Sequence, residues 1–319
     1  MYNIYYIGAQ NSERIDFCQW PYMVTGGDLF DGEFDAIEDD DRIQGWERKI
    51  TSKKLNIEIH AVGVSLEQAI DQLENVAEKD VLNTTPGRLY VGSSYIKGWL
   101  VGTTKDRWLQ DIDSISNELT FKSDYPYWIT EEEFRFYKQG SESSEALEWL
   151  EFPYDVPYEF SKVRNLQYIN NSNYTASGFK MIIYGPCINP LIRIAGHIYE
   201  LRTTLYDGEY AVIDSSTRYA KDRKIVKVKA DGTEENLFNS KNNESSIWEK
   251  IPAGLSIVSW NGAFGFDIIL FNERGYAKMD FTLTDIYGQE KGPLEHCGVN
   301  MVLGTDNDFQ ITIQNSLYD

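Results

Sequence analysis

An aromatic-rich stretch from residue 83 to residue 128 constrains the fold of this chain more than any other segment. Turn residues there alternate with short runs of β-branched and aromatic residues, which predicts a β-ribbon. Its expected strands are Leu89–Val91, Tyr95–Val101 and the residues around Leu119–Phe121. The ribbon ends in the run Asp124-Tyr125-Pro126-Tyr127-Trp128. Because it is rich in large rigid rings and offers no candidate nucleophile, metal ligand or phosphate-binding loop, it indicates packing and protein contact rather than catalysis.

The charge of the chain restricts its partners. The 30 basic and 50 acidic side chains give a formal net charge of −20. Binding through phosphates needs a basic surface, and anionic lipid repels an acidic one, so we expect no direct nucleic-acid binding and no membrane insertion. With 42% hydrophobic and 14% aromatic residues, the composition is not that of a disordered chain. The sequence has no long apolar run and no signal-peptide pattern, so a soluble protein is expected.

The length of 319 residues predicts about two domains. We place them at residues 1–148 and 149–319. The first is expected to be a β-rich α+β domain, with strands at Ile4–Ile7 and Leu55–Ile59 and a strongly acidic loop at residues 28–41 between them.

One helix has a well-defined predicted start and spans residues 65–79. Ser65 is a favourable N-cap, and Gln68 three residues later completes a capping box. The apolar residues that follow recur at helical spacing: Leu66, Ala69, Ile70, Leu73, Val76 and Ala77. This stripe predicts a helix that packs on the sheet of its own domain.

From about residue 160 onward the chain is expected to form strands alone. The expected strands include Phe179–Tyr184, Leu191–Leu201, Ala211–Ile213, Ile225–Val228, Leu255–Trp260, Phe266–Phe271, Phe281–Leu283 and Ile311–Ile313. The pair Asn261-Gly262 is the strongest short hairpin signal among the turns. Short strands at this spacing predict an antiparallel β-sandwich or jelly roll, so the fold class is mainly β.

The sequence lacks the usual patterns of catalytic and metal sites. No G-x-S-x-G elbow or phosphate-binding loop occurs in it. No two histidines lie at a metal-ligand spacing: His60, His197 and His296. The odd number of distant cysteines is not a disulfide framework: Cys18, Cys187 and Cys297. The acidic residues between Asp28 and Asp41 could hold calcium, but they lack the EF-hand order, which favours a solvated or partner-facing loop. We therefore expect no enzyme, no metal and no cofactor.

Four stretches of the chain, in this order, carry a family resemblance. The first two are the helix-containing N-terminal β-domain and the ribbon from Pro86 to Trp128. The third is the strap Phe152–Tyr158 together with Ile183–Pro186, Asn189-Pro190 and Gly208–Tyr210. The fourth runs from Ile251–Gly254 to Phe271–Gly275. In this order and pattern the chain resembles the distal tail proteins of long, flexible-tailed bacteriophages. The acidic loop 28–41 and the segment 280–319 depart from the family pattern.

The resemblance implies a structural protein of the virion, located at the tail tip and made in the host cytoplasm. It implies a hexameric ring formed by the N-terminal domains, with galectin-like C-terminal domains outside the ring. The implied partners are the tail tube protein, a hub or tail-associated protein, and receptor-binding proteins. A surplus of acidic residues around the channel of such a ring would keep passing DNA from adhering.

Two sets of aromatic residues are candidates for function. The first set would anchor contacts between copies or with partners: Tyr95, Trp99, Trp108 and Trp128. Packing in the chain's own core is the alternative for each of them. The second set belongs to a rival function, a lectin that recognises host-surface glycans by stacking sugar rings: Trp248, Trp260, Tyr276 and Tyr287. A shallow groove with an exposed Trp flanked by Asn, Asp or Arg would favour sugar binding.

Overall fold

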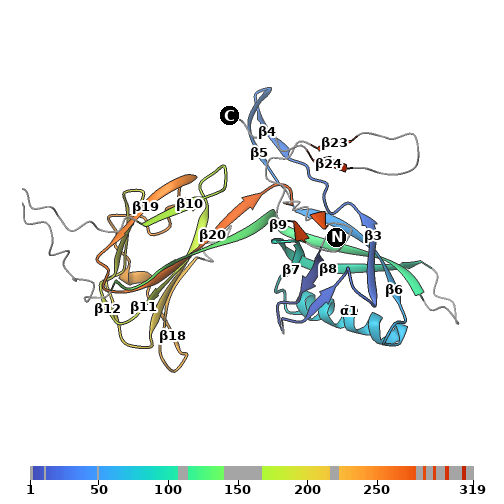
Figure 1. Ribbon diagram of the computed structural model, residues 1–319, viewed down its shortest axis with the longest axis horizontal. Helices are drawn as coiled ribbons and strands as arrows, with labels where there is room; N and C mark the ends of the chain where they lie inside the picture. Colours follow the sequence, from blue (N-terminus) through green and yellow to red (C-terminus); the bar gives the residue numbers. More distant parts are fainter. Residues whose placement is uncertain are drawn as a thin grey trace, which may run out of the picture.

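The computed structural model describes residues 3–10, 12–48, 50–106, 114–139, 167–215 and 223–277, together with the backbone of four short strands between residues 283 and 313. Two β-rich bodies lie side by side and are connected by two long neighbouring strands, β9 (Ser114–Phe136) and β20 (Phe266–Arg274) (Figure 1). The described residues form mostly strands and a single α-helix, α1 (Leu66–Leu82). The predicted mainly β class is therefore confirmed.

Short strands make up most of both bodies. The first body also contains β1 (Ile4–Ile7), β2 (Arg14–Asp16), β3 (Tyr22–Gly27), β4 (Asp35–Asp39), β5 (Arg42–Glu47), β6 (Thr51–His60), β7 (Gly87–Val91) and β8 (Ser94–Asp106). The second body contains β10 (Gln167–Asn171), β11 (Gly178–Tyr184), β12 (Cys187–Ile188), β13 (Leu191–Ile194), β14 (His197–Glu200), β15 (Thr204–Leu205), β16 (Tyr210–Asp214), β17 (Lys224–Val228), β18 (Glu234–Asn236), η2 (Phe238–Ser240) and β19 (Gly254–Trp260). Near the C-terminus, β21 (Leu283–Thr284) pairs with β22 (Glu290–Lys291), and β23 (Val299–Met301) pairs with β24 (Ile311–Ile313).

Helix α1 begins as the sequence predicts. The backbone N–H of Gln68 donates to Ser65 Oγ, and the Ser65 N–H donates to Gln68 Oε1, each at 3.2 Å, so the capping box is confirmed. The helix ends at Leu82, later than predicted, and the Asn83 side-chain amide donates to the Lys79 carbonyl at 2.7 Å. The predicted stripe faces the sheet, with these members buried: Ala69, Leu73, Val76 and Ala77.

The core of the second body lies between two antiparallel sheets. One is the β18-β17-β16-β11-β20 part of a 12-stranded sheet that continues through β9 into the first body, and the other runs β10-β19-β13-β14. Alternate residues of both sheets point inward, including Phe179 and Met181 from β11 and Ile192 from β13, all with essentially no exposed surface. The predicted antiparallel sandwich is therefore confirmed for this part of the chain.

Strand β9 differs most from the prediction, which placed a strand at Leu119–Phe121 and a proline-containing exit after it. The strand instead continues through Pro126 to Phe136. Its first half pairs with β6 up to Ser123, and its second half pairs with β20 from Trp128 onward. Pro126 therefore lies in the gap between two partners on that side, where a missing N–H costs no ladder hydrogen bond. This change of partner lets one strand belong to both bodies.

Two turn predictions were wrong because tertiary pairing decided the outcome. The strand predicted at Leu191–Leu201 is a hairpin, since Ala195 and Gly196 have positive φ values of 49° and 83°. The pair Asn261-Gly262 does not close a hairpin. Strand β19 before it pairs with β10 and β13, whereas β20 after it pairs with β11 and β9. The turn instead carries the chain from one sheet of the sandwich to the other.

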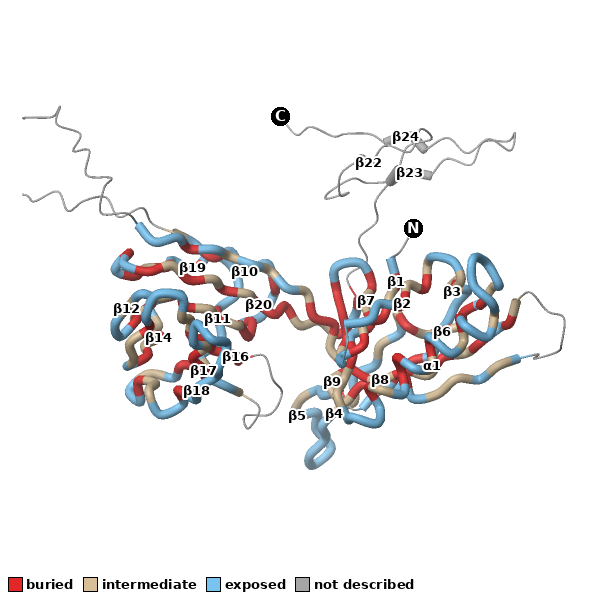
Figure 2. The backbone as a smooth tube through the Cα atoms, turned by 90° about the horizontal axis from the view of Figure 1, so that it is seen from below, coloured by how far each residue is buried: buried red, intermediate tan, exposed pale blue. Residues whose placement is uncertain are grey.

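The acidic segment predicted as a loop contains a hairpin, which we call the arm (residues 35–47). Strands β4 and β5 pair with each other alone, and the turn residues Asp40 and Asp41 have positive φ values of 46° and 59°. Figure 2 shows the arm as an almost wholly exposed tube that extends away from the first body.

Two separate cores accompany the two bodies. The predicted boundary between residues 148 and 149 lies outside the described residues, so the division into domains stays a prediction. Phe136 belongs to the second core, and Ala277, near the end of the described chain, belongs to the first. In the part of the chain that the structure describes, no helix is long and apolar enough to span a membrane.

Candidate functional site

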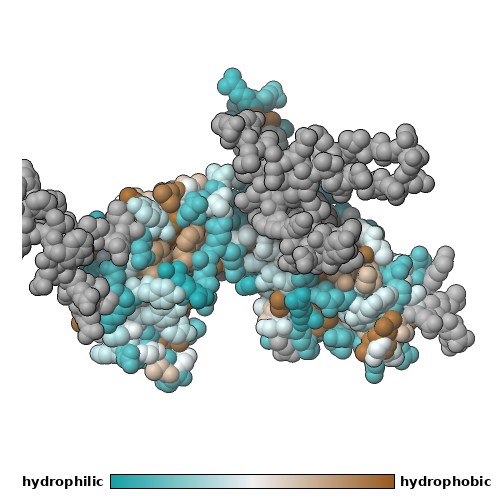
Figure 3. Space-filling view, viewed as in Figure 1, coloured by the Kyte–Doolittle hydropathy of each residue, from teal (hydrophilic) through white to brown (hydrophobic). Residues whose placement is uncertain are grey.

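The arm carries three large apolar side chains that are exposed to solvent. Ile37, Ile43 and Trp46 are 44%, 55% and 61% exposed. Its turn is acidic, with Asp39, Asp40 and Asp41 in succession. Figure 3 shows hydrophilic surface at the tip of the arm and hydrophobic surface nearer its base. An isolated hairpin is only marginally stable in water, and exposed apolar residues grouped in this way are typical of an interaction surface.

Arg48, directly after β5, fixes the base of the arm. Its Nη1 donates to the Pro126 carbonyl at 2.6 Å and also to the Gly275 carbonyl. The side chain is 5% exposed, and its guanidinium lies 5.2 Å from the centre of the Phe34 ring. Burial lowers the pKa of Arg48 from its ordinary value. Arg48 thus connects the arm to both β9 and the end of β20.

A row of tyrosines crosses the sheet on the face opposite the first core. Tyr5 stacks on Tyr90 with ring centres 4.6 Å apart, and Tyr90 lies 5.2 Å from Tyr95. Guanidinium groups cover both ends of the row, with Arg14 over Tyr5 at 3.8 Å and Arg88 over Tyr95 at 4.7 Å. Tyr90 and Tyr95 pack in a small cluster with Ile129 of β9 and Phe271 of β20.

The Tyr95 hydroxyl connects this row to β9, because it donates to Glu131 Oε1 at 2.7 Å. Burial, followed by the nearby Glu131 carboxylate, raises the pKa of Tyr95. Arg88 lies 3.7 Å from the same carboxylate.

Of the four predicted contact anchors, two are buried in the chain's own interior. Tyr95 and Trp128 are each only 2% exposed, which agrees with packing in the chain's own core, the alternative given for each of them. Trp99 is half-buried, and its Nε1 donor has no hydrogen-bond partner among the described residues. Trp108 lies outside the described residues. Sequence reasoning missed Trp46, because the acidic segment was interpreted as a loop. The pair Ile37 and Ile43 around Asp40-Asp41 was the available hairpin signal.

The three predicted sugar-stacking residues that the structure describes have different surroundings. Trp260 is 9% exposed, and its Nε1 donates to the Phe264 carbonyl at 2.9 Å, so it is a core residue. Trp248 packs against the second core with Arg223 5.8 Å from its ring. Tyr276 is exposed, and the centre of its ring lies 6.3 Å from that of the Phe34 ring in the first body. Tyr287 lies outside the described residues.

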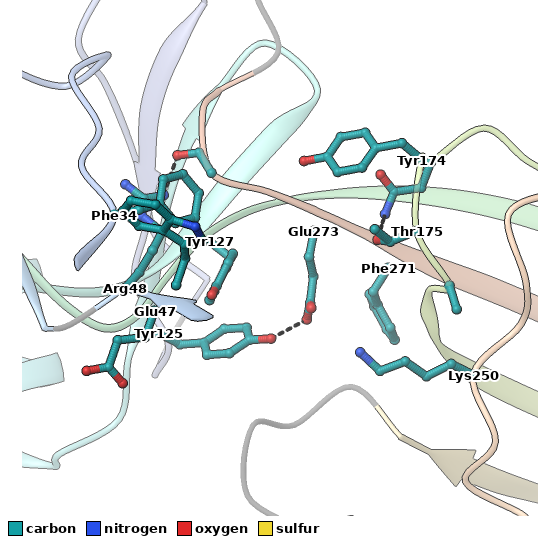
Figure 4. Close-up of a pocket in the computed structure, with 14 residues that line it drawn as sticks. Phe34, Glu47, Arg48, Tyr125, Tyr127, Tyr174, Thr175, Lys250, Phe271 and Glu273 are labelled. Carbon is teal, nitrogen blue, oxygen red and sulfur yellow. Dashed lines mark hydrogen bonds between the residues drawn. The ribbon is translucent and has the colours of Figure 1, made fainter. Parts of the chain in front are cut away.

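A groove of about 550 Å³ lies where the two bodies meet (Figure 4). Phe34, Arg48 and Tyr127 lie on one side of it, and Tyr174, Thr175 and Lys250 lie on the other. Glu273 of β20 lies between the two sides and accepts a hydrogen bond from the Tyr125 hydroxyl. Neither the groove nor Tyr174 was singled out from the sequence, because its two walls are far apart along the chain.

Catalytic chemistry has little support in the described residues. They contain no group of three or more His, Cys, Asp or Glu side chains placed to hold a metal ion, and this includes the acidic arm. His197 Nε2 lies 3.2 Å from Ser245 Oγ, but that hydroxyl donates to the Ile198 carbonyl at 2.6 Å. Nucleophilic catalysis would require the Ser245 hydroxyl to donate to the imidazole, and here it donates to a backbone carbonyl instead. His296 and Cys297 lie outside the described residues.

Solved structures of phage tail proteins share this architecture. A chain of the phage P2 baseplate in its activated conformation with Ca is 14% identical and has a TM-score of 0.58. That match covers 86% of this chain and 99% of the baseplate chain. The Dit protein of phage SPP1, described as a paradigm of the hub adsorption apparatus in phages that infect Gram-positive bacteria, is 8% identical with a TM-score of 0.52. That match covers 86% of this chain and 99% of the SPP1 chain.

The chain has the fold of a phage distal tail protein. The P2 baseplate with Sr gives the same result, with 13% identity, a TM-score of 0.58, and coverage of 87% of this chain and 100% of that one. No protein-family model matches the sequence, and no curated protein matches it. The Dit fold thus extends over nearly all of the matched chains, although few side chains are shared.

Proposed function

We propose that this protein is a structural component of a phage tail tip. In this proposal its copies close into a ring, hexameric as the sequence resemblance implies, that joins the tail tube protein to hub and receptor-binding proteins of the virion. The N-terminal body forms the ring, and the galectin-like C-terminal body lies outside it. The Dit fold over both bodies is the observation that carries this proposal.

The arm supports ring formation from the residues themselves. A closed ring needs one surface of each copy to fit a different surface of the next. The arm projects from its own body and presents exposed Ile37 and Ile43, which suits insertion into a neighbouring copy. Arg48 holds its base, so less conformational entropy is lost when the arm is covered.

Light scattering on the purified full chain, followed by negative-stain imaging, tests the proposal. The expected result is a mass of about six copies and ring-shaped particles at high protein concentration or with the tail tube partner. Ile37→Asp combined with Ile43→Asp should shift the protein to monomers. Ile188→Asp on the second body, at a residue that is 72% exposed, is the matched control and should leave the ring intact. A wild-type monomer under all these conditions would contradict the ring.

A further inference from the structure

The groove between the two bodies combines exposed aromatic rings with hydrogen-bonding groups. Trp46 and Tyr174 line it from opposite bodies and are 61% and 70% exposed. Glu47, Thr175 and Lys250 also line it and are exposed. A volume of about 550 Å³ is within the usual range of small-molecule sites. Trp46 and Glu47 belong to the base of the arm, whereas neither the arm tip nor the tyrosine row lines the groove.

The walls are held in place before any ligand arrives. Arg48 fixes the first wall through the Pro126 carbonyl, and the Tyr125 and Tyr127 rings lie 5.1 Å apart. On the second wall, Asn173 is 5% exposed and its Nδ2 donates to Thr175 Oγ1 at 3.3 Å. The Arg274 guanidinium lies 5.7 Å from the Tyr174 ring. Such support lowers the entropy lost on binding.

The chemistry of the groove discriminates among classes of ligand. An anion such as a phosphate would meet the carboxylates of Glu47 and Glu273 beside Lys250, and Arg48 is already bonded to two carbonyls. A wholly apolar ligand would leave Glu47 and Lys250 without hydrogen bonds at the cost of their hydration. A sugar ring has an apolar C–H face that packs on an aromatic ring and a rim of hydroxyls that can both donate and accept. Carboxylate, ammonium and hydroxyl groups next to exposed rings match that pattern.

We propose that this groove binds a neutral oligosaccharide. Trp46 and Tyr174 supply the faces on which sugar rings pack, Glu47 accepts hydrogen bonds from sugar hydroxyls, and Lys250 and Thr175 donate to them. The site differs from the sugar-stacking set expected from the sequence. It contains the exposed Trp of the expected signature, and Arg48 and Asn173 are among its lining residues, although both side chains are buried. Because the walls come from both bodies, a bound sugar would also hold the bodies together.

Glycan-array screening of the full chain, followed by calorimetric titration of the best neutral glycan, tests this site. Trp46→Ala and Tyr174→Ala should each weaken binding about tenfold, since a lost aromatic contact is worth up to roughly 1.4 kcal/mol. Trp20→Ala removes a tryptophan that is 56% exposed elsewhere on the first body and should leave affinity unchanged. Circular dichroism and melting curves verify that each variant is folded.

Three results would overturn the sugar site. They are no glycan bound at millimolar concentration, equal affinity in the wild type and in both groove variants, or binding of extended peptides alone at this groove. The ring is measured separately by light scattering, and the ring-disrupting pair Ile37→Asp with Ile43→Asp leaves the groove residues Trp46 and Glu47 in place. The proposed tail-tip function and the sugar site can therefore fail independently.

Discussion

The Tyr6 hydroxyl on β1 donates a hydrogen bond of 2.6 Å to the Asp80 carboxylate on helix α1, and both side chains are fully buried. The other carboxylate oxygen of Asp80 accepts from the Ala9 backbone N–H at 2.9 Å. The pair joins the start of the chain to the helix across 74 positions. A buried carboxylate is tolerated here because both of its oxygens are bonded.

Replacing Asp80 tests this connection. Asp80→Ala leaves the Tyr6 hydroxyl and the Ala9 N–H unpaired in the interior, so we expect a loss of about 2–4 kcal/mol in the free energy of unfolding. Urea denaturation of wild type and variant measures the difference. Asp71→Ala, at an exposed position on the same helix, is the control and should change stability by less than about 0.5 kcal/mol. Equal stability of the Asp80 variant and the wild type would show that the pair contributes nothing net.

The N-cap of α1 offers a second, smaller test. Ser65→Ala removes the acceptor for the Gln68 N–H, and we expect it to cost about 1 kcal/mol. Ser65→Asp keeps an acceptor at the N-cap and should be close to wild type. Thermal unfolding followed by circular dichroism measures both, and a wild-type melting temperature for Ser65→Ala would argue against a stabilising cap.

Arg48 should control the mobility of the arm. Arg48→Met keeps much of the side-chain volume but loses the hydrogen bonds to Pro126 and Gly275, so we expect a destabilisation of about 2–3 kcal/mol. Hydrogen exchange of the β4 and β5 amides should become faster in this variant. Arg42→Met, at an exposed position on β5, should leave the exchange rates as they are. Unchanged arm protection in Arg48→Met would refute the connection.

Alkaline pH should destabilise the protein through two tyrosines whose pKa is raised in the folded chain, the buried Tyr22 and the more exposed Tyr184. Burial raises the pKa of Tyr22 to about 12, and burial with the Asp267 carboxylate raises that of Tyr184 to about 12. Above pH 10 the unfolded chain loses these protons while the folded chain keeps them. Stability is therefore fully present below pH 10 and declines as the pH rises toward 12.

Denaturant titrations between pH 9 and pH 11.5 measure this decline. Tyr22→Phe removes one titrating group, so the decline should become shallower, even though the hydrogen bond to the Ala69 carbonyl at 2.7 Å is lost at all pH values. If Tyr22→Phe leaves the slope of the unfolding free energy against pH unchanged, Tyr22 has the same pKa in the folded and the unfolded chain.

Local patterns predicted the elements whose stability is local. Ser65 and Gln68 satisfy each other within one turn, and the alternation of Leu55, Ile57 and Ile59 needs only one buried face, so both features were correct from the sequence. The resemblance to distal tail proteins was likewise visible as an order of such elements, and the fold comparison agrees with it.

The sequence by itself thus determined the helix, most strands, the mainly β class and the acidic character of the chain. Tertiary structure alone decided which strands pair, because long-range partners compete with local turn preference. It turned Asn261-Gly262 into a crossing between sheets and carried β9 through Pro126. It also decided which rings are exposed. Tyr95 and Trp128 are enclosed by neighbours distant in sequence, whereas Trp46 and Tyr174 are exposed and line a groove whose walls come from both bodies.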